Sequence, residues 1–146
     1  MATPLARAFH AMSTDPAGDV VLFGGSNMAA IPTLFSDTWT YNGAAWTLET
    51  PIASPPARWK HAMALNQADS LVYLHGGLDA GGATLDDTWT WDGSAWTQLS
   101  PATTPAIAAG GLSYDPLTGN LLLVGDVSGV LTLYAWDGSD WQQLAP

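Results

Sequence analysis

Short apolar runs recur along the chain, and each is bounded by Gly, Pro, Asn or Asp. The most apolar runs are VVLF at residues 20–23, LVYLH at residues 71–75 and NLLLV at residues 120–124. Runs of this length that are rich in β-branched and aromatic residues are typical of β-strands. No segment combines a helical period with capping residues, so the pattern predicts an all-β protein.

The apolar runs belong to a repeat with a period of about fifty residues. RAFHAM at residues 7–12 matches RWKHAM at 58–63, and SDTWTYNGAAWT at 36–47 matches DDTWTWDGSAWT at 86–97. A weaker third copy ends in LYAWDGSDW at 133–141. Each copy contains four expected strands. One such sheet cannot bury both of its faces, so we expect the three copies to stack.

The spacing between the expected strands separates turns from loops. Asn-Gly or Asp-Gly divides the third and fourth strands of each copy, at residues 42–43, 92–93 and 137–138. Both positions of these dipeptides can adopt positive φ, which predicts tight hairpins. The stretches after the second strand vary in length, which predicts surface loops. These expected loops cover residues 26–35, 78–85 and 127–131.

The repeat resembles the Kelch family over the whole chain. The motif consists of an apolar run with a glycine doublet, followed by two aromatic residues seven positions apart. Its structural residues here are Gly24, Gly25, Trp39, Trp46, Gly76, Gly77, Trp89, Trp96, Tyr134 and Trp141. The third copy departs from the motif at Ile107 and Asp126, so it resembles a degenerate blade. The resemblance implies three β-propeller blades, each a four-stranded antiparallel meander, at residues 1–51, 52–101 and 102–146.

Three blades are fewer than the roughly four to eight that close a propeller. The two end blades would expose large apolar faces, which soluble monomers rarely tolerate. We therefore expect a homodimer in which two half-propellers close one six-bladed ring. The alternative is a designed or excised propeller fragment that has no function beyond folding and self-assembly.

Composition narrows the possible partners. The 146 residues are 47% hydrophobic and include three Lys+Arg against thirteen Asp+Glu, which gives a formal charge of −10. Such a charge disfavours nucleic acids and anionic membranes as partners. We recognise neither a signal peptide nor a transmembrane segment, so we expect a soluble protein whose compartment the sequence leaves open.

The absence of cysteine excludes disulfides and thiol chemistry. It also excludes the Tyr-Cys copper radical site of some Kelch-like oxidases. The acidic residues lack the alternating spacing of a calcium loop, and no serine lies in a nucleophile motif. We expect no catalytic residue, metal ion or cofactor, and the protein is interpreted as non-enzymatic.

Arg7 and Arg58 occupy equivalent positions and, with Lys60, are all the Lys and Arg residues of the chain. They could form structural ion pairs, for example with Asp37 or Asp87, because a guanidinium satisfies several acceptors at once. They could instead form an anion site at the mouth of the propeller channel. We favour the structural interpretation.

His10 and His61 also recur, and the resemblance places them on the strand that lines the channel. They could form a metal-binding or pH-sensitive cluster, but we favour packed side chains. His75 stands in place of Phe23, which we interpret as a tolerated replacement.

The repeat-fixed tryptophans are assigned to the core between blades. Trp59, which we align with Phe9 and Ala108, is the exception and lies beside the arginines in sequence. The candidate binding surface is the variable loops together with Arg7, Phe9, His10, Arg58, Trp59, Lys60 and His61. The expected function is a protein-interaction or scaffold module. A glycan-binding propeller is the alternative, because aromatic faces can stack on sugars.

Overall fold

The structure is a computed structural model that describes residues 2–144. It contains three four-stranded antiparallel sheets, and in each sheet the strands follow one another in chain order. The described residues contain no helix, so the all-β prediction is confirmed for them. The arrangement is consistent with propeller-like blades, and the sheets are named blades 1, 2 and 3 below.

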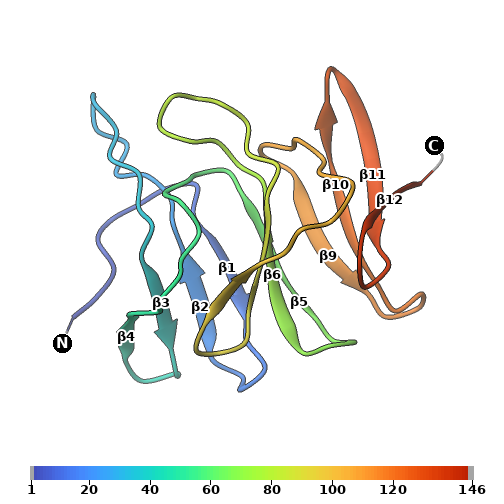
Figure 1. Ribbon diagram of the computed structural model, residues 1–146. Coiled ribbons are helices and arrows are strands. Elements are labelled where there is room, and N and C mark those ends of the chain that lie inside the picture. Colours follow the sequence, from blue (N-terminus) through green and yellow to red (C-terminus); the bar gives the residue numbers. More distant parts are fainter. Residues whose placement is uncertain (1, 145–146) are drawn as a thin grey trace.

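The strands of the three blades have the following bounds. Blade 1 consists of β1 (Ala11–Thr14), β2 (Val20–Phe23), β3 (Thr38–Tyr41) and β4 (Trp46–Glu49). Blade 2 consists of β5 (Ala62–Asn66), β6 (Leu71–His75), β7 (Thr88–Trp91) and β8 (Trp96–Gln98). Blade 3 consists of β9 (Gly111–Asp115), β10 (Asn120–Val127), β11 (Val130–Trp136) and β12 (Trp141–Leu144). The blades lie side by side in chain order, with blade 2 in the middle (Figure 1).

The blades are joined by backbone hydrogen bonds just before their first strands. Lys60 N donates to Phe9 O at 2.9 Å, and Ala109 N donates to Lys60 O at 2.8 Å. All three residues have a positive φ, between 56° and 57°. Phe9, Lys60 and Ala109 are therefore the equivalent positions. The alignment of Trp59 with Phe9 is wrong, because the backbone pairs Trp59 with Leu78 as it pairs Ala8 with Ser26.

The hydrophobic core lies between adjacent blades. At the junction of blades 1 and 2, Val21 and Phe23 pack against a group of blade 2 residues that includes Trp89, Trp91 and Trp96. At the junction of blades 2 and 3, Tyr73 packs against a group that includes Trp136 and Trp141. Blade 2 thus buries one face on blade 1 and the other on blade 3, whereas blades 1 and 3 each bury one face on blade 2.

The glycine doublets allow close approach between blades. Gly24 has a φ of 64°, and a Cβ there would lie 2.7 Å from the carbonyl oxygen of Arg58 in the next blade. Gly76 has a φ of 68°, and a Cβ there would collide with the carbonyl oxygen of Ile107. A side chain at either position would therefore push neighbouring blades apart.

The hairpins between the third and fourth strands are longer than a two-residue turn. Tyr41 pairs with Trp46, so four residues form the loop, and among them only Gly43 has a positive φ. Asn42 Oδ1 accepts hydrogen bonds from the backbone N–H groups of Ala44 and Ala45. The prediction of tight two-residue hairpins is wrong, because the side-chain oxygen closes a wider turn. Blades 2 and 3 repeat this arrangement at Asp92 and Asp137.

Blade 3 also differs from the expectation after its second strand. The predicted loop at residues 127–131 is a continuous hairpin in which Val127 pairs with Val130. Ser128 and Gly129 form its turn with φ of 55° and 84°, as a tight two-residue hairpin requires. Asp126 replaces the second glycine and pairs with Leu131, so the strand continues where blades 1 and 2 turn away.

Candidate functional site

Arg58 is fully buried and forms a structural ion pair within blade 2. Its guanidinium donates to both carboxylate oxygens of Asp87, at 2.6 and 2.7 Å. It also donates to the carbonyl oxygens of Gly76 and Pro56, at 3.0 and 3.1 Å. Trp89 Nε1 donates to Asp87 Oδ2 at 2.7 Å. Every polar group of the pair therefore has a partner inside the blade.

Arg7 makes the same set of contacts in blade 1. It donates to both carboxylate oxygens of Asp37, at 2.6 and 2.8 Å, and to Gly24 O at 3.0 Å. Trp39 Nε1 donates to Asp37 Oδ2 at 2.6 Å, and the guanidinium carbon lies 4.2 Å from the centre of the Phe35 ring. The structure thus brings both arginines to the aspartates named from the sequence.

The two aspartates remain charged in these pairs. Burial alone would raise the pKa of Asp87, but the hydrogen bonds and charge of Arg58 outweigh burial and hold that pKa below its ordinary value. The same balance, with Arg7 as the cation, lowers the pKa of Asp37. Each guanidinium is already satisfied by a carboxylate and two carbonyls, so the pairs explain the arginines without an external anion.

His61 packs in the junction of blades 1 and 2. Its ring lies edge-on to Phe23 at 5.6 Å, and a Cβ on Gly24 would lie 3.0 Å from its Cε1 atom. Neither ring nitrogen has a hydrogen-bond partner among the described residues. Burial, with a smaller effect of the nearby Arg58 charge, lowers the pKa of His61 to about 3. His61 is therefore neutral at physiological pH and belongs to the core.

His10 occupies the equivalent place in blade 1 but has no blade before it. It is partly buried, and burial followed by the charge of Arg7 lowers its pKa. Both histidines immediately precede the first strands rather than lying on them. Among residues 2–144, no group of three or more His, Cys, Asp or Glu side chains gathers where it could hold a metal ion.

His75 has a structural function that the sequence did not reveal. Its Nε2 lies 2.8 Å from the carbonyl oxygen of Pro105, and its Nδ1 lies 2.9 Å from Thr88 Oγ1. Because a carbonyl only accepts, we assign the proton to Nε2 and let Nδ1 accept from the Thr88 hydroxyl. Burial lowers the pKa of His75, which favours this neutral form. The side chain thereby ties blade 2 to the segment that leads into blade 3.

Phe9, Trp59 and Lys60 form an exposed group that we name the aromatic cluster. The Phe9 and Trp59 rings meet edge-to-face with centroids 5.4 Å apart. The Lys60 ammonium lies 4.7 Å from the centre of the Trp59 ring and 5.4 Å from that of Phe9. Phe9 is 46% exposed, and the two other side chains are partly buried. Phe9 is the most exposed of the seven individually named residues of the candidate binding surface, and residues 27–33 and 80–84 of the variable loops are also exposed.

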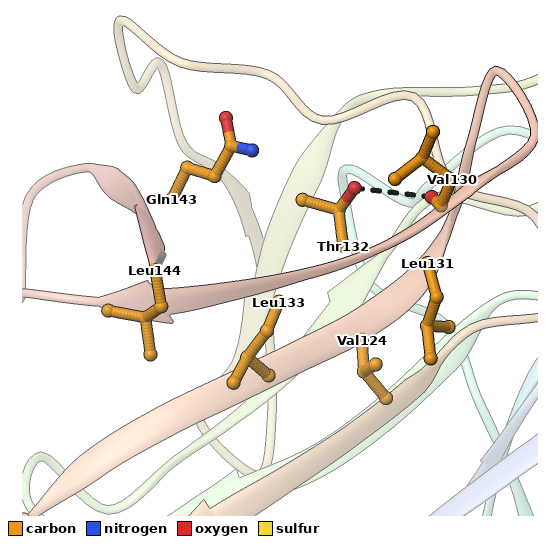
Figure 2. A pocket seen from close by; sticks show the side chains of 7 residues that line it. All are labelled: Val124, Val130, Leu131, Thr132, Leu133, Gln143 and Leu144. Atoms are coloured by element: carbon orange, nitrogen blue, oxygen red, sulfur yellow. Dashed lines mark hydrogen bonds between the residues drawn. The ribbon is translucent and has the colours of Figure 1, made fainter. Parts of the chain in front are cut away.

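A hollow of about 450 Å³ opens on the free face of blade 3. It is lined by Val124, Val130, Leu131, Thr132, Leu133, Gln143 and Leu144. Figure 2 shows that Val124, Leu131, Leu133 and Leu144 point to the same side of the sheet. No motif marked this hollow in the sequence. The one sequence feature that could have marked it is Val124, which occupies the same repeat position as Phe23 and His75.

None of the described residues forms a helix with the length and apolar character needed to cross a membrane. No protein-family model matches the chain, and no curated protein is significantly similar to it.

Proposed function

We propose that the protein is a Kelch-like β-propeller module that acts without catalysis, by binding another protein through the aromatic cluster. In this proposal two copies form one six-bladed ring, which serves as the rigid support for that surface. The Kelch assignment is supported by the glycine doublets and the aromatic spacing of the first two copies. The function is supported by one observation above all, the exposed position of the aromatic cluster.

The backbone that carries the aromatic cluster is held in place by hydrogen bonds to neighbouring segments. Trp59 and Leu78 exchange two backbone hydrogen bonds, at 2.9 and 3.2 Å, and Lys60 N is bonded to Phe9 O. A rigid backbone lowers the entropic cost of ordering aromatic side chains in a complex. Aromatic residues of this kind are enriched among those that dominate binding energy at protein interfaces.

The chemistry of the aromatic cluster favours a particular kind of partner. Lys60 makes no ion pair with any residue between 2 and 144, whereas Arg7 and Arg58 are both paired. Its ammonium lies over the ring faces that a sugar would otherwise cover. We therefore favour a peptide segment that offers a carboxylate to Lys60 and an apolar side chain to Phe9.

The proposed ring is supported by the apolar side chains that the two end blades expose. The face of blade 3 that would meet a following blade contains Val124, which is 36% exposed, whereas the equivalent Phe23 and His75 are 0% and 1% exposed. On the opposite end, Met12 of blade 1 is 51% exposed, whereas the equivalent Met63 is 8% exposed. The chain thus exposes one copy of each of the two faces that pack together at its internal junctions.

The binding proposal is tested with two displayed peptide libraries, one acidic and one basic, each with a fixed aromatic residue. Selection on the purified protein is expected to enrich acidic peptides. Their affinity should fall at least about 10-fold on Trp59→Ala and on Lys60→Gln. Ile52→Ala is the matched control, because Ile52 is fully exposed and lies outside the aromatic cluster.

Enrichment of basic peptides alone, or of peptides whose affinity Trp59→Ala leaves unchanged, would remove the aromatic cluster as the binding surface. A glycan array probed in parallel separates the alternative function. Glycan binding that depends on Trp59, without peptide binding, would replace the protein-interaction proposal.

A further inference from the structure

We infer that the hollow on blade 3 binds Trp46 of a second copy of this chain. The residues of one blade that receive the tryptophan of the next are called the seat below. This inference rests on the proposed homodimer and names the side chain that joins its halves. It follows from the contacts that the two internal junctions share, and from what blades 1 and 3 present at the ends of the row.

Each internal junction is built around one tryptophan of the following blade. At the first junction, Trp96 lies edge-on to Phe23 with centroids 5.4 Å apart, and its indole N–H donates to Thr38 Oγ1 at 2.9 Å. At the second, Trp141 lies edge-on to His75 at 5.3 Å and donates to Thr88 Oγ1 at 3.0 Å. The tryptophan is 3% exposed in the first case and 1% exposed in the second.

Blade 3 carries the seat of such a junction without its tryptophan. By repeat position, Val124 corresponds to Phe23 and His75, and Leu133 corresponds to Thr38 and Thr88. Val124 and Leu133 pair with each other across β10 and β11, so they lie side by side on the sheet. Both line the hollow, and their side chains point to the same side of the sheet (Figure 2).

Blade 1 carries the tryptophan without its seat. The Trp46 ring contacts Tyr41 with centroids 5.1 Å apart, as Trp96 contacts Trp91 at 5.3 Å and Trp141 contacts Trp136 at 5.1 Å. Trp46 and Tyr41 are only partly buried, whereas the corresponding aromatic residues of blades 2 and 3 are buried. Trp46 therefore contacts the same neighbouring position as the two junction tryptophans do, but no blade covers it.

The seat on blade 3 is more apolar than its internal counterparts. Leu133 has no hydroxyl to accept the indole N–H that Thr38 and Thr88 accept, and Leu131 and Leu144 extend the apolar lining. Leu131 lies in the sheet, beside the hollow, because β10 and β11 continue beyond the point where the chain turns away in blades 1 and 2. The contact we infer is therefore a hydrophobic one, and Leu133→Thr would add the hydrogen bond found at the other two junctions.

The same equivalence predicts which backbone segments meet. The bonds from Lys60 N to Phe9 O and from Ala109 N to Lys60 O form a ladder along the row of blades. A second copy that seats Trp46 on blade 3 brings its own Phe9 beside Ala109. In a two-fold ring this contact occurs twice and ends the assembly at two chains.

The test combines affinity with cross-linking. Sedimentation equilibrium is expected to show that Trp46→Ala and Leu133→Asp each weaken self-association at least about 30-fold. Together they should weaken it by less than the product of the two effects, because they remove one contact. Leu133→Thr is expected to retain or strengthen association. Leu117→Asp is the matched control, since Leu117 is 95% exposed in a distant turn.

Since the chain has no cysteine, Phe9→Cys/Ala109→Cys supplies the only thiols for a short bifunctional maleimide. The inference predicts a covalent dimer and no larger species. Circular dichroism of each variant identifies a loss of folding, and Leu133→Asp keeps the test available if Trp46→Ala does not fold. Dimers that resist both substitutions, or that do not cross-link, would overturn the seat while leaving the homodimer intact. A wild type that does not self-associate would overturn both.

Discussion

Trp141 donates its indole N–H to the Thr88 hydroxyl at 3.0 Å across the junction of blades 2 and 3. The same hydroxyl lies 2.9 Å from His75 Nδ1, and His75 Nε2 lies 2.8 Å from the carbonyl of Pro105. One threonine thus joins the side chains of two blades. The corresponding Thr38 accepts from Trp96 but faces Phe23, which offers no hydrogen-bonding atom.

The unequal bonding of the two threonines gives a first prediction. Thr88→Val leaves two buried polar groups without a partner, the Trp141 N–H and His75 Nδ1, whereas Thr38→Val leaves one. We expect Thr88→Val to lower the free energy of unfolding by about 2–4 kcal/mol and Thr38→Val by about 1–2 kcal/mol. Urea denaturation at pH 7 measures both. Equal losses would contradict the three-residue connection through Thr88.

A second prediction concerns the buried ion pair. Arg58→Ile leaves the Asp87 carboxylate without its cation, so we expect a loss of about 3–5 kcal/mol in the free energy of unfolding. Blade 3 carries Ile107 and Thr132 at the equivalent positions. The double variant Arg58→Ile/Asp87→Thr is therefore expected to recover part of that loss, about 1–3 kcal/mol.

Lys60→Gln is the control for the ion-pair experiment. It removes one positive charge, as Arg58→Ile does, but breaks no ion pair among the described residues. Its effect on stability should stay within about 0.5 kcal/mol. If the double variant proves no more stable than Arg58→Ile alone, the pair is not the source of the loss.

A third prediction concerns pH. The pKa of His61 is 6.5 in the unfolded chain and about 3 in the folded protein, so below pH 6.5 the unfolded state binds a proton that the folded state does not. Stability should therefore fall as pH decreases from about 6.5, with a slope approaching about 1.4 kcal/mol per pH unit for this residue. His75 contributes in the same direction, because its pKa is also lowered.

The aspartates do not obscure this pH window. The pKa values of Asp37 and Asp87 lie below 3.8 in the folded protein, so the stability they contribute is present above that pH and is lost only below it. Urea denaturation between pH 7 and pH 4.5 is compared for the wild type and His61→Phe, in which a ring can still pack on Phe23. The variant should show a shallower decline, and an unchanged slope would contradict the buried neutral His61.

The sequence was sufficient to predict the blades and the ion pairs, because both are periodic. Arginine and aspartate recur together in the first two copies and are both missing from the third, where Ile107 and Thr132 replace them. A bidentate ion pair needs both members. Their joint presence in two copies and joint absence from the third therefore indicates that the arginine and the aspartate pair with each other. The same periodicity correctly assigns Trp89, Trp96 and Trp141 to the core between blades. It wrongly assigns Trp46 there, because no blade covers that face of blade 1.

Two of the misassigned features, the hairpin turns and the role of His75, depend on local geometry that periodicity does not encode. An Asn-Gly dipeptide suits a two-residue turn, but the Asn42 side chain selects a four-residue loop by bonding two backbone N–H groups. The alignment of Trp59 with Phe9 is a different kind of error, because the matched segments RAFHAM and RWKHAM already pair Phe9 with Lys60, as the backbone does. The bond from His75 to Pro105 depends on the path between blades 2 and 3, which the sequence does not specify.

The central claim is that three blades form half of a closed ring. Size-exclusion chromatography with multi-angle light scattering, over a wide range of concentrations at neutral pH, tests it most directly. The account predicts a single species whose mass is twice the 15.3 kDa of one chain. A stable, monodisperse species of 15.3 kDa at the highest concentration would contradict it.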